Sequence, residues 1–258
     1  MIVTALLFLW LSPAAPQTDA GLAAEGPPAV IGQEKAAQSS VQKLAASLTK
    51  YYVGHFTMGP NWSAEPGPKV IEGRKKGREV LAAHVKDGKI VGVAEATGKS
   101  GASMIVFFKT TTEAEAWTVI NEFPGVKSGF YKGKLFEVWG TKGLGEKMQE
   151  TLKPAEAPAT KPFYLAVTTK GKKWQSKPSN EQLKHVEAGA ENLLKSMESG
   201  KLKFYAAFTG SGDPRGIAIF EAGSMEEAQK MAKSGPLMNS KWLSVAVTEC
   251  SVVDGTFP

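Results

Sequence analysis

The 258-residue sequence has one cysteine, Cys250, and three histidines, and these scarcities restrict its chemistry. A single cysteine cannot form an internal disulfide, so disulfide stabilisation is excluded. No two histidines have the spacing of metal ligands, and no Cys/His/Asp cluster is present, which argues against a structural or catalytic metal site. We therefore expect no metal and no cofactor. Cys250 is interpreted as a strand residue near the carboxyl end.

A strong excess of one charge is also missing. Lys and Arg number 31 against 25 Asp and Glu, which gives a formal net charge of +6, and most lysines are interleaved with glutamates. This balance favours a mixed, solvated surface over a nucleic-acid groove, although an anionic surface stays open as a partner. The segment ATGKSG (96–101) lacks the upstream Gly of a Walker motif, and no G-x-S-x-G elbow is present.

No apolar run is long enough to cross a bilayer. Residues 2–11 form a run of ten residues, whereas a membrane-spanning helix needs about 20. The run is typical of a secretory signal, with small residues before Ala20 and no basic residue in front of it. We predict a signal peptide at 1–20 and export to the periplasm or beyond the cell; an uncleaved anchor and a wrongly assigned start are the alternatives. Asn61 begins an N-x-S sequon, which matters only in a glycosylating host.

The clearest feature that is present is a repeat. Displaced by 112 residues, segment 50–128 aligns with 162–240 without a gap, and 19 of 79 positions are identical. The segments YYVGHFTMGPNW (51–62) and FYLAVTTKGKKW (163–174) show the likeness: each is an apolar run followed by Gly, two residues and Trp. A period of this length indicates a duplicated domain rather than a solenoid.

Each copy predicts the element order β-α-β-β-α-β, which is the ferredoxin-like unit. In the second copy, the stripe of apolar residues in 179–199 recurs every three or four positions and predicts a helix, and Gly200 can cap it. The alternating segment 202–209 predicts a strand, and Ser224 with Glu227 predicts a capping box. Strands at 163–169, 217–220 and 242–249 complete the second copy. The first copy is predicted to have elements at 51–57, 70–87, 90–97, 104–109, 113–122 and 134–139.

A four-stranded sheet with both helices on one face leaves the other face bare. By alternation, we expect that face to carry Tyr52, Phe56, Val93, Glu95, Tyr164 and Tyr205. It is too apolar to remain in water, so the two sheets should bury it against each other. We predict a mixed α+β fold in which two ferredoxin-like units form an intramolecular dimeric α/β barrel, a monomer that is its own pseudo-dimer.

The predicted organisation has five parts: signal peptide 1–20, leader and linker 21–49, first repeat 50–140, a Pro/Ala-rich linker 141–162 and second repeat 163–258. The leader is expected to end in a short helix, and the linker allows one helical turn.

The sequence resembles the YCII-related domains. The shared pattern is a strand, a helix ending in Gly-Lys-Leu, a strand, a Gly-rich turn, a strand and then Ser-x-Glu-Glu-Ala. Two later segments also resemble the family: EFPGVKSGFYKGKLFEVW (122–139) and SGPLMNSKWLSVAVTEC (234–250). The resemblance covers about 50–140 and 163–250. It implies a dimeric α/β barrel in a family of which a minority are enzymes.

The chemistry proposed for that family rests on a His in the first helix and an Asp before a Pro. The matching positions are Gly77 and Gly189 for the His, and Phe123 and Gly235 for the Asp. Both copies lack both residues, so the resemblance does not imply that activity here.

Two residues are candidates for catalysis. His84, near the end of the first long helix, could act as a general base because its unperturbed pKa lies near neutrality. Glu95 is expected on the bare sheet face, where a carboxylate would bind a ligand or stand exposed at an edge. Of the other histidines, His55 is expected against the helices as a satisfied buried residue, and His185 on the surface.

The aromatic pairs Tyr52 with Tyr164 and Trp62 with Trp174 occupy equivalent positions. They serve as core packing or, together with Tyr205, as the aromatic lining of two equivalent pockets. We therefore expect a non-catalytic protein that binds a small ligand or acts as a scaffold. The alternative is an enzyme acting on a small aromatic or phenolic compound, with His84 or Glu95 as base in one shared cavity; a module binding another protein is a third class.

Overall fold

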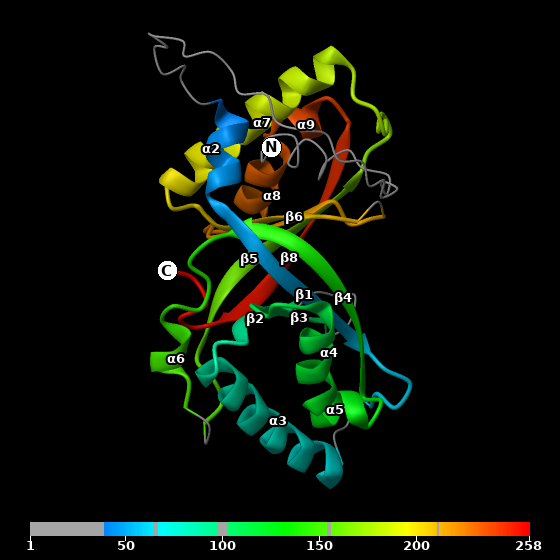
Figure 1. Ribbon diagram of the computed structural model, residues 1–258, viewed down its shortest axis with the longest axis vertical. Coiled ribbons are helices and arrows are strands. Elements are labelled where there is room, and N and C mark those ends of the chain that lie inside the picture. The colour runs from blue at the N-terminus through cyan, green and yellow to red at the C-terminus, as the bar shows by residue number, and fades with distance from the viewer. Residues whose placement is uncertain (1–38, 64–66, 97–102, 154–155, 211) are drawn as a thin grey trace, which may run out of the picture.

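The computed structural model describes residues 39–63, 67–96, 103–153, 156–210 and 212–258 (Figure 1). The predicted signal peptide and most of the leader lie outside these residues. The first half comprises α2 (Ser40–Ala46), β1 (Leu48–Met58), α3 (Pro68–Lys86), β2 (Ile90–Ala96), β3 (Ser103–Phe108), α4 (Glu113–Glu122), α5 (Pro124–Lys127) and β4 (Tyr131–Thr141). After it come α6 (Met148–Thr151), β5 (Thr160–Lys170), α7 (Asn180–Glu198), β6 (Leu202–Phe208), β7 (Gly216–Phe220), α8 (Met225–Lys233), α9 (Pro236–Asn239) and β8 (Leu243–Val253).

Most elements of the two halves have the same bounds displaced by 112 residues, and β7 and α8 are each one residue shorter than β3 and α4. The shift carries β1 onto β5, α3 onto α7, α5 onto α9 and β4 onto β8 residue for residue. The predicted order of strands and long helices is present in both halves. The short helices α5 and α9 were not predicted, although each begins at a proline, which suits the first position of a helix.

The helix ends follow from local chemistry. Gly200 takes a left-handed conformation with φ of 71° directly after α7, as predicted for its cap. The predicted capping box at α8 forms with one difference. The Ser224 hydroxyl accepts from the Glu227 amide, but the Glu227 carboxylate accepts from the Gly223 amide, one residue before the cap. The equivalent arrangement occurs at the start of α4.

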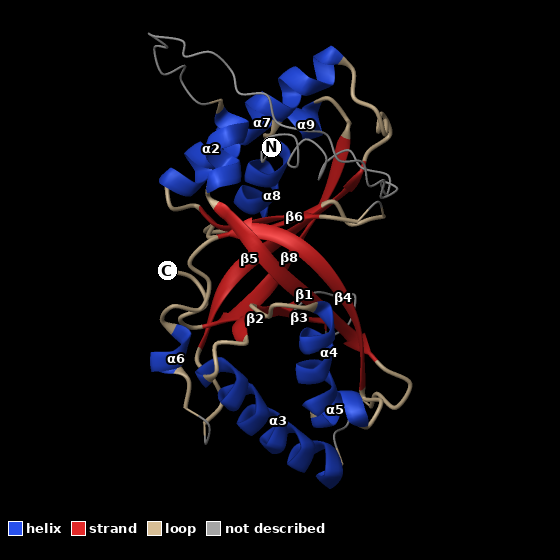
Figure 2. Cartoon of the chain, viewed as in Figure 1, coloured by secondary structure: helices blue, strands red, loops and turns tan. Residues whose placement is uncertain are grey.

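The eight strands close into one antiparallel barrel in the order β1-β3-β2-β8-β5-β7-β6-β4. Each half contributes four adjacent strands, and β2 with β8 and β4 with β6 join the halves. Figure 2 shows the strands crossing in the middle of the molecule, with α3, α4 and α5 at one end and α7, α8 and α9 at the other. Each junction is made by three residue pairs, and these close the two sheets into one barrel.

The barrel interior is one apolar cluster built by both halves. Phe204 shows the continuity, because its ring lies 4.9 Å from Phe107 and 6.4 Å from Tyr51 of the first half, centroid to centroid. Gly140 fits this packing, since a Cβ there would lie 2.7 Å from the Phe204 ring. The fully enclosed members of the cluster include Tyr51, Val53, Ala94, Ile105, Phe107, Val138, Phe204, Ala206, Ile219, Cys250 and Val252.

The predicted assignment of sheet faces is wrong. Tyr52, Phe56 and Val93 pack under the helices of the first half, and Tyr164 and Tyr205 under those of the second. The opposite set, with Tyr51, Val53, Phe163 and Leu165 among its members, fills the barrel. His55 follows Tyr51 and Val53 by alternation, so it lies on the barrel side rather than against the helices.

The error has a physical cause. Both faces of these strands are apolar, so alternation separates the two faces without telling which of them meets the helices. Register shifts between Ile90 and Gly92 in β2, and between Leu202 and Phe204 in β6, also exchange the faces within a strand.

The two short leading helices cross over to the opposite half. Helix α2 packs against α7, and the Glu187 carboxylate accepts from the amides of Ser40 and Val41 at its start. Helix α6 contacts α3, and the Gln149 side chain donates to the Val85 carbonyl at 3.1 Å. Across the described ranges, every helix is too short or too polar to cross a membrane.

Candidate functional site

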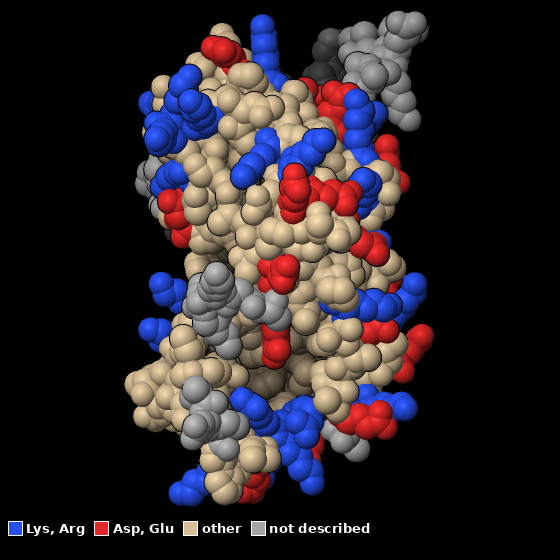
Figure 3. Space-filling model, turned by 180° about the vertical axis from the view of Figure 1, so that it is seen from behind, with Lys and Arg blue, Asp and Glu red and all other residues tan. Residues whose placement is uncertain are grey.

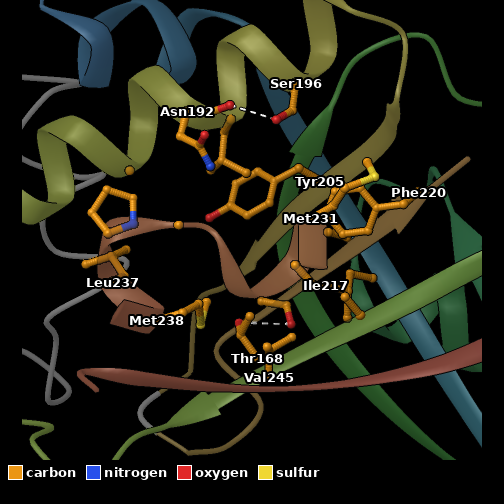
Figure 4. Close-up of a pocket in the computed structure, with 18 residues that line it drawn as sticks. Thr168, Asn192, Ser196, Tyr205, Ile217, Phe220, Met231, Leu237, Met238 and Val245 are labelled. Carbon is orange, nitrogen blue, oxygen red and sulfur yellow. Dashed lines mark hydrogen bonds between the residues drawn. The ribbon is translucent and has the colours of Figure 1, made fainter. Parts of the chain in front are cut away.

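A cavity lies between the helices and the sheet of the second half (Figure 4). Its volume is about 70 Å³, enough for a few water-sized groups. Most of its walls are apolar and come from α7, α8, α9 and the sheet. The labelled lining residues in Figure 4 are Thr168, Asn192, Ser196, Tyr205, Ile217, Phe220, Met231, Leu237, Met238 and Val245.

Four polar side chains interrupt the apolar lining. The Ser196 hydroxyl donates to the Asn192 carbonyl at 2.8 Å, and the Thr168 hydroxyl donates to the Gly216 carbonyl at 3.2 Å. The Asn192 side-chain amide projects with the Tyr205 hydroxyl into the same space (Figure 4). An apolar cavity with a few convergent polar groups is the usual form of a small-molecule site.

Of the aromatic residues predicted to line pockets, only Tyr205 lines this cavity. Tyr52 is buried under the first-half helices with the Lys50 ammonium 4.9 Å from its ring centre, and Tyr164 packs in the second-half helical layer.

The equivalent tryptophans pack against other aromatic rings. Trp62 lies 4.5 Å from Phe130 between ring centroids, and Trp174 stacks on Trp242 at 4.8 Å. The Arg215 guanidinium lies 5.1 Å from the Trp174 ring. Both tryptophans therefore hold the strand-to-helix connection against the loop before the last strand of their half. Next to Trp62, the Asn61 amide donates to the Ser128 carbonyl at 2.7 Å.

His84 and Glu95 do not lie together in the described cavity. His84 is 7% exposed, and its Nε2 lies 2.9 Å from the Glu122 carboxylate at the end of α4. Its Nδ1 is buried without a hydrogen-bond partner among the described residues. Glu95 is exposed on β2, on the side of the helices.

A group of charged and aromatic residues occupies the helix–sheet space of the first half. Burial raises the pKa of the Tyr131 phenol; the charge of Arg74 opposes this rise, and that of Glu95 adds to it. Arg74 and Glu95, both exposed, therefore each lie within electrostatic range of the Tyr131 phenol. Figure 3 shows this half of the molecule hollowed, with Lys and Arg on one rim of the hollow and Asp and Glu on the other.

The other titratable residues considered, His55, His185 and Cys250, lie in surroundings typical of structural residues. Burial, with help from Lys134, lowers the pKa of His55. His185 faces Glu181 one turn earlier on α7, at 3.9 Å. Burial raises the pKa of the Cys250 thiol to about 12, so a thiolate nucleophile is disfavoured. No group of three potential metal ligands occurs among the residues that the structure describes.

Sequence reasoning missed most of the cavity. Asn192 and Ser196 are four residues apart on α7 and flank its apolar stripe, which is the only sequence signal that two polar groups lie on one helical face. Met231, Leu237 and Met238 come from α8 and α9, and their position over the sheet depends on the tertiary fold.

The architecture is that of a closed α/β barrel, and solved structures share it. A mutant chlorite dismutase from Candidatus Nitrospira defluvii matches with a TM-score of 0.51 and 14% identity, covering 85% of this chain and 94% of its own. A second mutant of that enzyme matches with a TM-score of 0.50 and 14% identity, covering 83% and 92%. A heme-binding protein from Thermus thermophilus matches with a TM-score of 0.47 and 12% identity, covering 81% and 94%.

No protein-family model and no curated protein matches the chain. The structural matches therefore establish the dimeric α/β-barrel type of fold and leave function open.

The second-half cavity does not suit a haem. Sites for drug-sized ligands enclose roughly 300–1,000 Å³, whereas this cavity holds about 70 Å³. Haem iron is held by His, Cys, Met or Tyr. His and Cys are absent from the lining; Tyr205, Met231 and Met238 are its residues of the other two types. A porphyrin in this cavity would displace the packed side chains.

Proposed function

We propose that this protein is a non-catalytic binder of a small, mostly apolar molecule that carries a hydrogen-bonding group. The observation that carries the proposal is the second-half cavity, in which the Asn192 amide and the Tyr205 hydroxyl project from apolar walls. The volume of about 70 Å³ restricts the buried part of the ligand to a few heavy atoms, such as a short chain or part of a ring.

The arrangement does not support the enzyme alternative. That alternative required His84 and Glu95 to face one cavity, whereas neither lines the one described. His84 is instead paired with Glu122, in an arrangement that joins α3 to α4. We therefore assign no catalytic base.

We also infer that the chain is a tandem duplication of one ferredoxin-like unit of the YCII-related type, and that it works as a monomer. The support is the repeated element bounds, the 19 identities at the same displacement, and a barrel that the two halves close within one chain. In oligomers of such units, a second subunit supplies the other half of the barrel. Light scattering on the purified chain tests this point: a mass near 27.5 kDa supports it, and an obligate dimer contradicts it.

Export stays part of the proposal. Its support is the apolar run at 2–11 followed by small residues. Mass spectrometry of the chain produced in its native host would find the amino terminus at Gly21. A chain that retains residues 1–20 in the cytoplasm would contradict export.

The binding proposal is tested by thermal shift of the full chain against small alcohols, phenols and short-chain amides. A ligand that binds only the folded state raises the melting temperature. Asn192→Leu keeps the side-chain volume and removes the amide, and we expect it to weaken binding about 3- to 10-fold, as for one hydrogen bond.

Glu191→Gln is the matched control, because Glu191 is exposed beside Asn192 and pairs with Lys195 at 2.6 Å. Its affinity for each ligand should equal that of the unaltered chain. If no compound shifts the melting temperature, or if Asn192→Leu binds as well as the control, the cavity is not the binding site.

A further inference from the structure

The helix–sheet space of the first half has a different chemistry from the cavity of the second. Helix α3 is the counterpart of α7, residue for residue. On α7, Val186 packs against Leu237 and Trp242, and Ala190 lies in the core with Leu44. The residues at the same two positions of α3 are Arg74 and Arg78.

Both arginines lie on the helix face that carries the core residues of α3; Arg78 is half-buried there, and Arg74, nearer the start of the helix, is exposed. Leu81 and Val85 pack in the first-half core, and Arg78 precedes them by three and seven residues. Arg74 lies one turn before Arg78. Residues at these spacings share one face of a helix. The two guanidinium groups therefore extend from the face that α3 turns toward the sheet.

These two arginines have no acidic partner in the described part of the chain. Its ion pairs within 4.0 Å involve lysines and histidines, for example Lys76 with Glu72 on the outer face of α3. The Arg78 Nε is buried and has no hydrogen-bond partner among the same residues. A buried cationic donor without a partner is costly, and an anion satisfies it.

The opposite wall supplies a hydrogen-bond donor and apolar surface. The centroid of the Tyr131 ring lies 5.1 Å from that of Phe130 in an edge-to-face contact. The charges of Arg74 and Glu95 both act on the Tyr131 phenol. Met104 and Leu135 are partly buried in the same cluster. The second half has Leu243 and Ala207 where the first has Tyr131 and Glu95, so polar side chains at these two positions occur in the first half alone.

We propose that this recess of the first half binds a small organic monocarboxylate, with its carboxylate on Arg74 and Arg78 and its apolar body on Met104 and Leu135. The Tyr131 phenol donates the remaining hydrogen bond. Glu95 stands at the rim and repels a second negative charge, which disfavours a dianion such as phosphate. The site is separate from the cavity that contains Asn192.

Benzoate is the probe, and isothermal titration of the full chain measures its binding. Arg78→Leu and Arg74→Leu should each weaken benzoate binding at least 10-fold, as expected for a lost charge-assisted bond. Arg78→Lys keeps the positive charge but loses the planar guanidinium that can donate two parallel hydrogen bonds to a carboxylate. Its affinity for benzoate should lie between those of the unaltered chain and Arg78→Leu. Benzamide, which has the same shape without the charge, should bind at least 10-fold more weakly than benzoate.

Three controls test whether benzoate binds in this recess and not elsewhere on the chain. Lys76→Ala removes an exposed cation from the same helix and should leave benzoate affinity unchanged. Asn192→Leu, which alters the second-half cavity, should also leave it unchanged, so failure of one proposal is distinguishable from failure of the other. Inorganic phosphate should not compete with benzoate at equal concentration.

The proposal is overturned if the chain does not bind benzoate, if both leucine variants bind it like the unaltered chain, or if phosphate displaces it. Circular dichroism checks that each variant is folded. If Arg78→Leu does not fold, Arg74→Leu and the benzamide comparison decide the result.

Discussion

The two halves of the molecule have the same elements but differ in how they fill the space between helices and sheet. At four equivalent positions of the helices and the sheet, the first half has Arg74, Arg78, Glu95 and Tyr131, and the second has Val186, Ala190, Ala207 and Leu243. The barrel interior differs less between the halves, and His55, the equivalent of Val167, is a polar exception. Tyr51 and Phe163, Val53 and Leu165, Ile105 and Ile217, and Val138 and Cys250 are equivalent pairs, and all are buried and apolar.

This contrast distinguishes the barrel interior, which both halves build together, from the two helical layers. The interior is packed by side chains of both halves, so a polar substitution there would unpair a group in the common core. Each helical layer is formed mainly by the long helices of one half, although α2 adds to the second-half layer and α6 to the first-half layer, so the two layers can differ in sequence. The first-half layer accordingly has charged side chains at positions where the second-half layer is apolar.

The sharpest test of the shared interior is Phe204→Ala. Phe204 is fully buried and contacts Tyr51 and Phe107 across the junction between the halves. We expect the free energy of unfolding to fall by about 3–5 kcal/mol, as for other buried phenylalanines. Urea denaturation followed by circular dichroism measures the loss. Phe204→Leu is the control and should cost less than about 1.5 kcal/mol; a loss below about 1 kcal/mol for the alanine variant would contradict a common interior.

An exchange of equivalent residues tests the divergence of the helical layers. Ala190 is 4% exposed and packs with Leu44, so Ala190→Arg inserts both volume and charge, and we expect a loss of about 2–4 kcal/mol. Arg78→Leu in the first half removes a donor without a partner and should be neutral or stabilising by about 1 kcal/mol in the absence of ligand. Thermal unfolding of both variants gives the comparison. Equal losses at the two positions would show that the layers have not diverged.

The smallest expected effect concerns His55, whose counterpart in the second half is Val167. Burial lowers the pKa of His55 below its ordinary value of 6.5. The unfolded state therefore takes up a proton first as the pH falls below about 6.5, so stability decreases toward acid pH, at most by about 1.4 kcal/mol per pH unit for one group. Above that pH both states are neutral and His55 adds no pH dependence.

His55→Val should remove this part of the acid sensitivity. Urea midpoints at pH 7.5, 6.5 and 5.5 measure it, with His185→Gln as a surface control that should keep the slope of the unaltered chain. An unchanged slope in His55→Val would place the sensitive group elsewhere.

The sequence alone determined the order of the elements and the displacement that relates the halves. Apolar spacing identified the helix that begins near Asn180, and Gly200 fixed its end, because period and caps are local properties. The repeat then placed the equivalent helix that begins near Pro68. Composition also excluded an internal disulfide, because the sequence has one cysteine.

The tertiary structure decided which face of each sheet became the interior. Tyr52 and Tyr205 were expected there, but two apolar faces look alike in sequence, and the register shifts in β2 and β6 are set by pairing with neighbouring strands. The candidate sites could not be predicted from the sequence for the same reason. Asn192 meets Tyr205, and Arg74 approaches Tyr131, only where a helix crosses a sheet formed by residues far away in the chain.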